Sequence, residues 1–237
     1  MTERQRRLRL LPVSLPEAVV PWAALELEMK ACVRCHLASL RHQVVVYRGA
    51  PRPWVLFIGE APGKEEDASG LPFVGRAGRI LDRAVAASGL RPRDWGVTNV
   101  IMCRPPQNRF DRRAAAACRP WLEAKFGTLD PRVLVTLGTH ALEAFAPEEL
   151  PISRAAGHAA TIWGRTLFPM LHPASTLHSK RYGERWRDDW ARFAVLLPSL
   201  RPDPFAEGSK PRICSASPAG GLAPPGDGPG RALPLRS

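Results

Sequence analysis

The stretch Val55-Leu-Phe-Ile-Gly-Glu-Ala-Pro-Gly63 decides how the rest of the chain is interpreted. Four consecutive apolar residues followed at once by a turn-forming cluster are typical of a short buried strand that ends in a loop. A helical pattern follows over residues 77–87, where Ile80, Leu81, Ala84 and Val85 share one face. A strand, a loop and a helix in this order form the first unit of an α/β fold.

The alternation of strand and helix continues along the chain. Further strands are predicted at residues 43–47, 97–102, 133–137 and 166–171. Further helices are predicted at 22–29, 112–126, 139–145 and 186–197, and Pro120 is expected to kink the second of these or to start a new turn. We therefore expect an α/β fold, a three-layer α/β/α sandwich with a central, mostly parallel sheet of four to five strands.

Composition sets the class of protein and its domain boundaries. The chain has 237 residues, of which 45% are hydrophobic and 24% charged, as in globular proteins. No stretch is apolar enough to span a bilayer or to serve as a secretory signal, so we expect no membrane association and a cytoplasmic location. We predict a flexible basic N-terminus at 1–15 and one folded domain at 16–200. Residues 201–237 contain eight prolines and six glycines, and we predict a disordered tail there.

The chain is strongly basic, with a formal net charge of +12, and the tail accounts for only +2 of it. Of the 34 basic residues, 29 are arginines, whose planar guanidinium suits phosphate contacts. Binding to a nucleic-acid backbone explains this charge, and so does an arginine-rich genome composition. Charge alone leaves both explanations open.

The cysteines point to metal-binding or redox thiols in an intracellular protein rather than to disulfides. Cys32 and Cys35 form a C-x2-C pair, and Cys103 and Cys118 are more distant single cysteines. Four thiolates in this arrangement can bind zinc or an iron–sulfur cluster, and the spacing does not decide between them. Cys214 lies in the predicted tail, and we assign it no role.

Three segments resemble the family 4 uracil-DNA glycosylases, the iron–sulfur branch of that superfamily. They are Gly59-Glu-Ala-Pro-Gly-Lys-Glu-Glu-Asp67, Gly70-Leu-Pro-Phe-Val-Gly-Arg-Ala-Gly78 and Thr98-Asn-Val-Ile-Met-Cys-Arg-Pro-Pro106. The resemblance covers roughly residues 25–197. It implies a three-layer fold, excision of uracil from DNA, and one [4Fe–4S] cluster at one side of the sheet, with Cys32, Cys35, Cys103 and Cys118 as its ligands.

The resemblance also implies the catalytic residues. Glu60 is expected to stabilise the developing positive charge on the sugar and to orient the attacking water, with Glu66 as the alternative carboxylate. His172 is expected to donate a hydrogen bond to the departing uracil anion. The other histidines show no partner pattern, and we assign no role to His36, His42, His140, His158 and His178.

The substrate-binding residues follow from the same resemblance. Phe73 is expected to stack on a uracil flipped out of the helix, and Asn99 to recognise its polar edge. The backbone of the first segment is expected to approach the base closely at Gly59, Ala61 and Gly63. Ala61 stands where the best-known glycosylase branch has a water-activating aspartate, and Gly63 where that branch has a thymine-excluding tyrosine. Water activation and thymine exclusion must therefore come from elsewhere in this chain.

DNA containing uracil is the expected partner, and a monomer is the expected state. Phosphate contacts are predicted for Arg109, Lys180 and Arg181, which belong to the basic segments on either side of the site. The segment after His172-Pro173 departs from the family 4 pattern, and Leu177 is the hypothetical wedge that replaces the flipped base. A partner in replication or repair for the tail stays open, and nucleoid association is expected while the protein is on DNA.

Two alternatives remain beside the glycosylase. A non-catalytic iron–sulfur DNA-binding relative would keep the fold and the cluster, and the altered second motif favours it. A zinc-dependent nucleotide hydrolase is the third hypothesis, although the sequence lacks the His and carboxylate set of an open catalytic zinc site.

Overall fold

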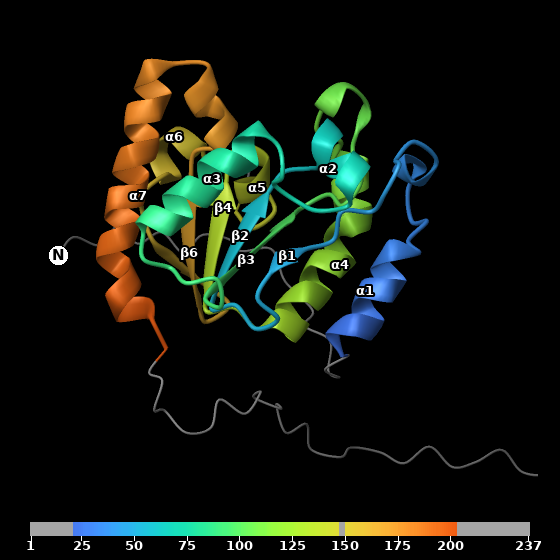
Figure 1. Cartoon of the computed structure of the whole chain (residues 1–237), viewed down its shortest axis with the longest axis horizontal. Helices are drawn as coiled ribbons and strands as arrows, with labels where there is room; N and C mark the ends of the chain where they lie inside the picture. The colour runs from blue at the N-terminus through green and yellow to red at the C-terminus, as the bar shows by residue number, and fades with distance from the viewer. Residues whose placement is uncertain (1–20, 147–149, 203–237) are drawn as a thin grey trace, which may run out of the picture. The chain divides into compact units, whose positions relative to one another are not determined.

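The computed structural model describes residues 21–146 and 150–202, which form an α/β fold (Figure 1). Its sheet has six strands in the order β1-β3-β2-β4-β6-β5. The four central strands pair in parallel, and each of the two edge strands pairs antiparallel with its neighbour. The strands are β1 (Arg48–Gly49), β2 (Val55–Gly59), β3 (Trp95–Asn99), β4 (Val133–Leu137), β5 (Ala160–Ile162) and β6 (Arg165–Met170). The predicted N-terminal segment 1–15 and the predicted tail beyond residue 202 lie outside the described residues.

Helices cover both faces of the sheet. They are α1 (Trp22–Lys30), α2 (Lys64–Ser69), α3 (Arg76–Ala87), α4 (Arg112–Leu129), α5 (Thr139–Glu143), α6 (Ile152–Ala155) and α7 (Lys180–Leu200). Three short 3-10 helices join them, η1 (His36–Ser39), η2 (Pro106–Asn108) and η3 (Pro173–Leu177). Among the described residues, none of the helices combines the length and the apolar character that crossing a bilayer requires.

The two faces of the sheet have separate cores because successive strand residues point to opposite sides. Phe57 of β2 packs with Leu81 of α3 and Phe193 of α7. Ile58, the next residue, packs instead with Met29 of α1 and helix α4. Figure 1 shows α3 and α7 on one side of the sheet and α1 and α4 on the other. The predicted three layers are therefore present.

The sheet departs from the prediction at its edges. It has six strands rather than four to five, because the three-residue β5 pairs with β6 and gives no pattern of its own in the sequence. The strand predicted at 43–47 is wrong, and only Arg48–Gly49 pairs with β3. Val44, Val45 and Val46 are buried, but in this stretch the Val45 N–H bonds the Met102 carbonyl (2.8 Å), beyond the end of β3. The apolar run therefore packs into the core without joining the ladder.

Other boundaries differ where the backbone leaves the sheet or the helix continues. β3 ends at Asn99 rather than at residue 102, because Val100 and Ile101 turn their N–H groups to the carbonyls of Gly59 and Glu60. Helix α4 continues as one helix through Pro120, where a kink or a new turn was expected. The acidic run at 65–67 lies in a helix, α2, although the sequence pattern favours an exposed loop.

Candidate functional site

A cavity of about 610 Å³ opens beyond the carboxyl ends of β2, β3 and β6. This is the edge where open parallel sheets bind their ligands. The cavity wall brings together seven of the residues that the sequence predicts for the site, Glu60, Ala61, Gly63, Glu66, Phe73, Asn99 and His172. The segments that carry them are up to 112 residues apart in the chain, so the fold itself assembles the predicted site.

Asn99 lies at the back of this cavity with an unsatisfied acceptor. It ends β3 opposite Gly59 of β2 and is only 2% exposed. Its Oδ1 is buried and has no hydrogen-bond partner within the described part of the chain. A buried acceptor without a partner costs about 1–3 kcal/mol. An N–H group of a bound ligand would satisfy it.

Gly59 makes room for the groups around that acceptor. A Cβ at this position would lie 2.5 Å from Asn99 Oδ1 and 2.5 Å from Phe73 Cζ. Both distances are too short for any side chain to be tolerated without moving the amide or the ring. Glycine at position 59 is therefore required by the close approach of Asn99 and Phe73, and the predicted approach of this backbone to a base stays a prediction.

Phe73 is held in a left-handed backbone conformation, with φ of 57° and a side chain only 6% exposed. The Arg48 guanidinium fixes this loop by donating to the carbonyls of Pro72 (3.1 Å) and Phe73 (3.2 Å). Gly78 lets the loop fold back onto α3, because a Cβ there would collide with the Phe73 carbonyl. The Phe73 ring lies 6.0 Å from the His172 ring, so the two rings flank one end of the cavity.

The Glu66 carboxylate joins the two loops of the cavity. Its Oε1 accepts hydrogen bonds from the N–H groups of Val74 (3.1 Å) and Gly75 (2.8 Å), and its Oε2 accepts one from Gly63 (3.0 Å). A Cβ at Gly63 would lie 2.7 Å from Glu66 Oε2, so the carboxylate occupies the space beside this glycine. Because three backbone donors occupy its oxygens, Glu66 is suited to hold the loops together rather than to activate water.

Glu60 is the carboxylate that stays available. No hydrogen bond to its carboxylate is present within the described residues. Burial raises its pKa above the usual range of a glutamate, the charge of His140 lowers it, and the charge of Glu143 raises it. A partly buried carboxylate that faces the same cavity as Asn99 can bind water or stabilise a cation.

His172 presents a hydrogen-bond donor to the cavity. Its Nδ1 accepts the N–H of Ala174 (3.2 Å), so the ring proton of the neutral form is assigned to Nε2. Burial lowers its pKa to about 4, with Glu66 partly opposing the shift. The ring is therefore neutral near pH 7 and can donate from Nε2. Gly138, with φ of 92°, leaves room for it, because a Cβ there would lie 3.0 Å from His172 Cβ.

The predicted phosphate-binding residues flank the cavity without lining it. Arg109 is exposed at the end of η2, and Lys180 and Arg181 are exposed at the start of α7. Leu177, the hypothetical wedge, is 44% exposed in η3 and lines the cavity. Arg109 directly follows Asn108, and Lys180 and Arg181 follow His178, and both Asn108 and His178 line the cavity; contact with phosphates stays a prediction.

The four predicted ligand cysteines are free thiols that come from three segments. Cys32 and Cys35 precede η1, Cys103 follows β3, and Cys118 lies in α4. Beyond the effect of burial, the charges of Cys118 and Cys35 raise the pKa of Cys103, and the charges of Cys35 and Cys32 raise the pKa of Cys118. No three His, Cys, Asp or Glu side chains in residues 21–146 and 150–202 are grouped closely enough to hold one metal ion.

Hydrogen-bond donors surround the thiols. Trp121 Nε1 donates to Cys32 Sγ (3.2 Å), and Arg41 donates to Cys103 Sγ (3.5 Å) and to the Cys32 carbonyl (2.7 Å). Burial raises the pKa of the Cys103 thiol to about 11, and Arg41 opposes part of this shift. Lys125 is completely buried nearby and donates to Thr98 Oγ1 (2.7 Å), and burial lowers its pKa to about 7. Donors and cations of this kind suit anionic sulfur ligands.

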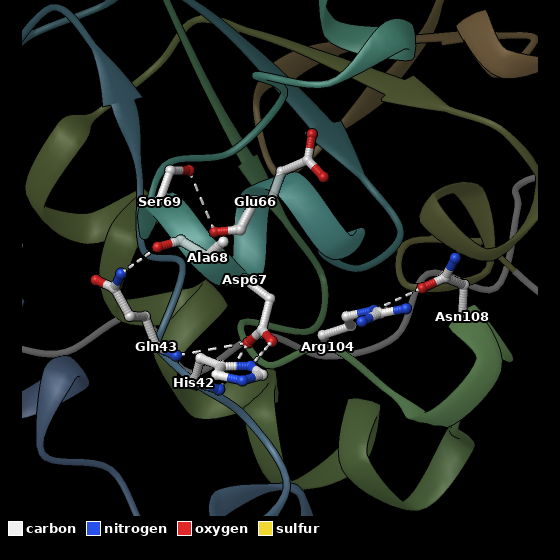
Figure 2. A network of polar contacts seen from close by, with 8 residues as sticks. All are labelled: His42, Gln43, Glu66, Asp67, Ala68, Ser69, Arg104 and Asn108. Carbon is white, nitrogen blue, oxygen red and sulfur yellow. Dashed lines mark hydrogen bonds and ion pairs between the residues drawn. The ribbon is translucent and has the colours of Figure 1, made fainter.

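Helix α2 connects the cysteine segment to the cavity. In Figure 2 the side chains of Glu66 and Asp67 leave the helix in opposite directions. Asp67 accepts hydrogen bonds from His42 Nδ1 (2.7 Å) and from the His42 N–H (3.0 Å). Gln43 Nε2 also donates to the Ala68 carbonyl (2.5 Å). The chain after Cys32 and Cys35 is therefore bonded to α2, the same helix whose Glu66 holds the cavity loops.

Comparison with known proteins identifies the family. The family model of the uracil DNA glycosylase superfamily matches residues 46–194. This chain belongs to the uracil-DNA glycosylase superfamily. A type-4 uracil-DNA glycosylase of Thermotoga maritima is 37% identical over 64% of this chain and 81% of its own length. Type-4 enzymes of Archaeoglobus fulgidus and Saccharolobus solfataricus are 33% and 32% identical over 75% and 77% of this chain, and over 94% and 90% of their own lengths.

Sequence reasoning about this superfamily member missed three kinds of residue. Arg48 fixes the Phe73 loop, although nothing near it in the sequence marks a site. Asn108 lines the cavity in a left-handed conformation (φ 56°) and its Oδ1 accepts from Arg104 Nε (2.8 Å), as Figure 2 shows. The Pro-Pro-Gln-Asn stretch could have indicated a tight turn at this point. His140 and Glu143 act on Glu60 from α5, and the sequence gives no signal of this.

Proposed function

We propose that this protein is a monofunctional DNA glycosylase that hydrolyses the N-glycosidic bond of uracil flipped out of DNA, leaving an abasic site for base-excision repair. The relatives named type-4 uracil-DNA glycosylases support this function. The observation that carries it is the buried Asn99 Oδ1, which has no partner within the described residues and lies beside Phe73 in the cavity. Such an acceptor fits the N3–H of uracil.

The cavity explains selection of the base. A base inside a duplex must leave the stack to reach a buried amide. The Phe73 ring offers a stacking face, which is worth about 1–3 kcal/mol per base. Uracil presents a donor at N3 and an acceptor at O4, which complement the acceptor and donor of the Asn99 amide. Cytosine presents the inverse pattern and would leave buried polar groups without partners.

His172 and Glu60 divide the chemistry between them. As the bond between the sugar and N1 breaks, its electron pair leaves with uracil, and the neutral His172 donates Nε2–H to the uracil O2 that gains negative charge. The Glu60 carboxylate stabilises the cationic sugar and orients a water molecule, whose oxygen forms the new bond to C1′. Glu66 holds the two loops in place during these steps.

The cysteines are proposed to hold a [4Fe–4S] cluster as a structural group. The free thiols of Cys32, Cys35, Cys103 and Cys118 and the donors Trp121 and Arg41 fit such a group, since thiolate ligands are stabilised by N–H bonds to sulfur. Because the pKa of Cys103 is raised, its ligation would release a proton near neutral pH. The bound cluster would tie the N-terminal segment to α4 and to the loop after β3.

The proposed partner is uracil-containing DNA, contacted at its phosphates by Arg109, Lys180 and Arg181. Their exposure, on segments that also carry the cavity-lining residues Asn108 and His178, supports this placement. A monomeric state, a cytoplasmic location and nucleoid association while on DNA stay predictions, as does a replication or repair partner for the tail.

The test is excision from a uracil-containing oligonucleotide, measured as alkali-labile breaks. Glu60→Ala and His172→Ala are each expected to slow excision by about a hundredfold to a thousandfold, the usual effect of losing a charge-stabilising group. Glu65→Ala and His178→Ala are the matched controls, because both residues line the cavity with exposed side chains. If breaks persist in Glu60→Ala, another group must orient the attacking water. A folded protein that binds DNA and makes no breaks would support the non-catalytic relative instead.

A further inference from the structure

A second group of charged side chains lies behind Glu60, outside the uracil cavity. His140 Nδ1 is 3.1 Å from Glu143 Oε2, and both belong to the short helix α5. The His140 ring stacks flat on Phe110, with centroids 4.1 Å apart and an interplanar angle of 2°. The ring is therefore fixed from two directions, and neither restraint comes from a residue that lines the uracil cavity.

The parallel pairing of β2 and β4 brings α5, which carries His140 and Glu143, to the edge of the sheet where Glu60 lies. β2 and β4 pair in parallel with Ile58 opposite Thr136. Glu60 follows directly after β2, and α5 begins two residues after β4 ends, so both leave neighbouring parallel strands at the same edge of the sheet. Helix α5 also contacts β2 directly. His140 is thus carried by a helix that contacts the strand from which Glu60 emerges.

A separate cavity of about 260 Å³ adjoins the pair and is lined by His140, Glu143, Phe110 and Val100. The Val100 N–H in turn bonds the carbonyl of Gly59, the residue before Glu60 (2.9 Å). Val100 thus lines the cavity beside the pair and also bonds the residue that precedes Glu60. The charges of His140 and Glu143 act on the Glu60 carboxylate with opposite signs.

We propose that His140 and Glu143 are positioning residues, a stacked ion pair behind the uracil cavity that sets the charge carried by Glu60. This inference rests on the proposed role of Glu60 as the carboxylate that acts near the sugar. The pair touches neither the base nor the attacking water. It acts through the electric field that it exerts on Glu60, with the cation and the anion of the pair working against each other.

The other charged groups around the pair have defined places. Arg112 of α4 lies 3.4 Å from Glu143 Oε2, and Arg119 of α4 lines the same cavity. Asp111 caps α4 and pairs with His36 (3.0 Å). On the uracil side, Glu60 shares its cavity with Lys64, Glu65, Glu66, Arg76, His172 and His178. Arginine keeps its charge throughout the accessible pH range, so Arg112 and Arg119 contribute a constant positive charge behind Glu60.

The test is the pH profile of single-turnover uracil excision between about pH 4 and about pH 9. If ionised Glu60 is the active form, the rate rises with pH along an acid limb that reports its pKa. His140→Gln removes a cation, so the limb should move up by about half a unit to one unit. Glu143→Gln removes an anion, so the limb should move down. The rate on the alkaline plateau should change by less than about threefold in both, well below a catalytic loss.

Controls separate this effect from a structural one. His158→Gln, a substitution of an exposed histidine paired with Arg192, should leave the limb in place. His140→Lys restores a cation and should return the limb toward its wild-type position. A packing defect behind the cavity would lower the plateau or the melting temperature of both glutamine variants without moving the limb in opposite directions.

Glu60→Gln tells the two possible failures apart. An acid limb that disappears in Glu60→Gln but stays fixed in His140→Gln and Glu143→Gln would overturn the pair and leave the role of Glu60 intact. A limb that persists in Glu60→Gln would overturn the role of Glu60 and the inference built on it. Shifts of both glutamine variants in the same direction would also overturn the inference.

Discussion

The uracil cavity and the cysteine site are built in contrasting ways. The cavity sits on the ends of three parallel strands, and backbone N–H groups fix its shape through the Glu66 carboxylate. The cysteines come from segments that lie outside the sheet, at the end of α1, after β3 and in α4. The protein chain alone thus completes the geometry of the cavity. The cysteine segments pack in one apolar core with α1 and α4, and donors to sulfur and the proposed cluster add to this packing.

Because of this contrast, substitutions at the two sites should have different consequences for the reaction and for the fold. A substitution in the cavity should change the reaction and leave the fold intact, because the sheet supports the cavity. A substitution at the cysteines should change the fold of the N-terminal segment first and the reaction afterwards. The following predictions test this separation, beginning with the largest expected effect.

Cys103→Ser should abolish cluster binding and destabilise the cysteine segments, because a hydroxyl is a poor replacement for a thiolate ligand. Iron content, visible absorbance and thermal unfolding measure this effect. Cys214→Ser, in the predicted tail, is the matched control and should leave all three unchanged. Full iron content in Cys103→Ser would remove this cysteine from the ligand set.

Asn99→Ala should lower kcat/KM for uracil excision by about a hundredfold to a thousandfold, because it removes the buried amide that recognises the base. The melting temperature should change little or rise, since the variant also removes a buried acceptor without a partner in the described residues. Steady-state kinetics and thermal unfolding test both statements. A large drop in melting temperature with unchanged kinetics would assign Asn99 a structural role.

Glu66→Gln should lower kcat/KM by about tenfold to a hundredfold, equivalent to the roughly 1–3 kcal/mol of an unsatisfied buried group. The amide keeps one acceptor oxygen but turns an NH2 group toward a backbone donor of the Gly63 or Val74–Gly75 loop. Glu65→Gln, at the exposed neighbouring residue, is the control. Equal kinetics of the two variants would show that the loops keep their positions without this clamp.

Asp67→Asn should lower the free energy of unfolding by about 1–3 kcal/mol at neutral pH. Burial opposes ionisation of Asp67, but the hydrogen bonds from His42 and Gln43 outweigh it and hold its pKa below the usual range. A carboxyl whose pKa is lowered on folding stabilises the protein above its unfolded pKa, and this stability is lost as pH falls through the folded pKa. The difference between Asp67→Asn and wild type should therefore shrink in acid, as measured by urea unfolding at several pH values. A difference that stays constant down to strongly acidic pH would contradict this account.

Removing one phosphate-binding side chain should give the smallest effect. Lys180→Ala or Arg181→Ala should reduce the slope of log K against log salt by about 0.9 for each phosphate that is no longer neutralised. Arg52→Ala is the control, because Arg52 lies between β1 and β2, at the opposite end of the parallel strands. Fluorescence anisotropy with a uracil-containing duplex at several salt concentrations measures the slope. Equal slopes in all three variants would place the DNA elsewhere.

The sequence predicts the elements of the fold that depend on local pattern. Residues 133–137 form β4 as expected, and the helix predicted at 77–87 is α3 to within one residue. The prediction of a strand at 43–47 is wrong because of tertiary packing. The valines of this segment have the pattern of a buried strand, but they pack beside the sheet instead of pairing with it. Hydrophobic periodicity indicates that a segment is buried, but it does not indicate which segment its backbone bonds.

The site shows the same limit. Glu60, Asn99 and His172 share one cavity because each ends or closely follows a strand, which the sequence pattern can indicate. Phe73 reaches the same cavity from the loop between α2 and α3. The burial of Glu66 and Asp67 could not be predicted, because an acidic run usually faces solvent and their partners are distant backbone groups. The relation of His140 to Glu60 depends on the pairing of β2 with β4, which no local pattern contains.

The six-residue helix α2 also restricts how the chain can vary in length. Surface connections usually tolerate insertions and deletions. Adjacent residues in a helix point about 100° apart, and here Glu66 faces the uracil cavity while Asp67 faces the cysteine segment (Figure 2). A residue inserted between them would turn one carboxylate away from its donors. This short acidic helix is therefore a spacer of fixed length, and natural length variation should fall outside it.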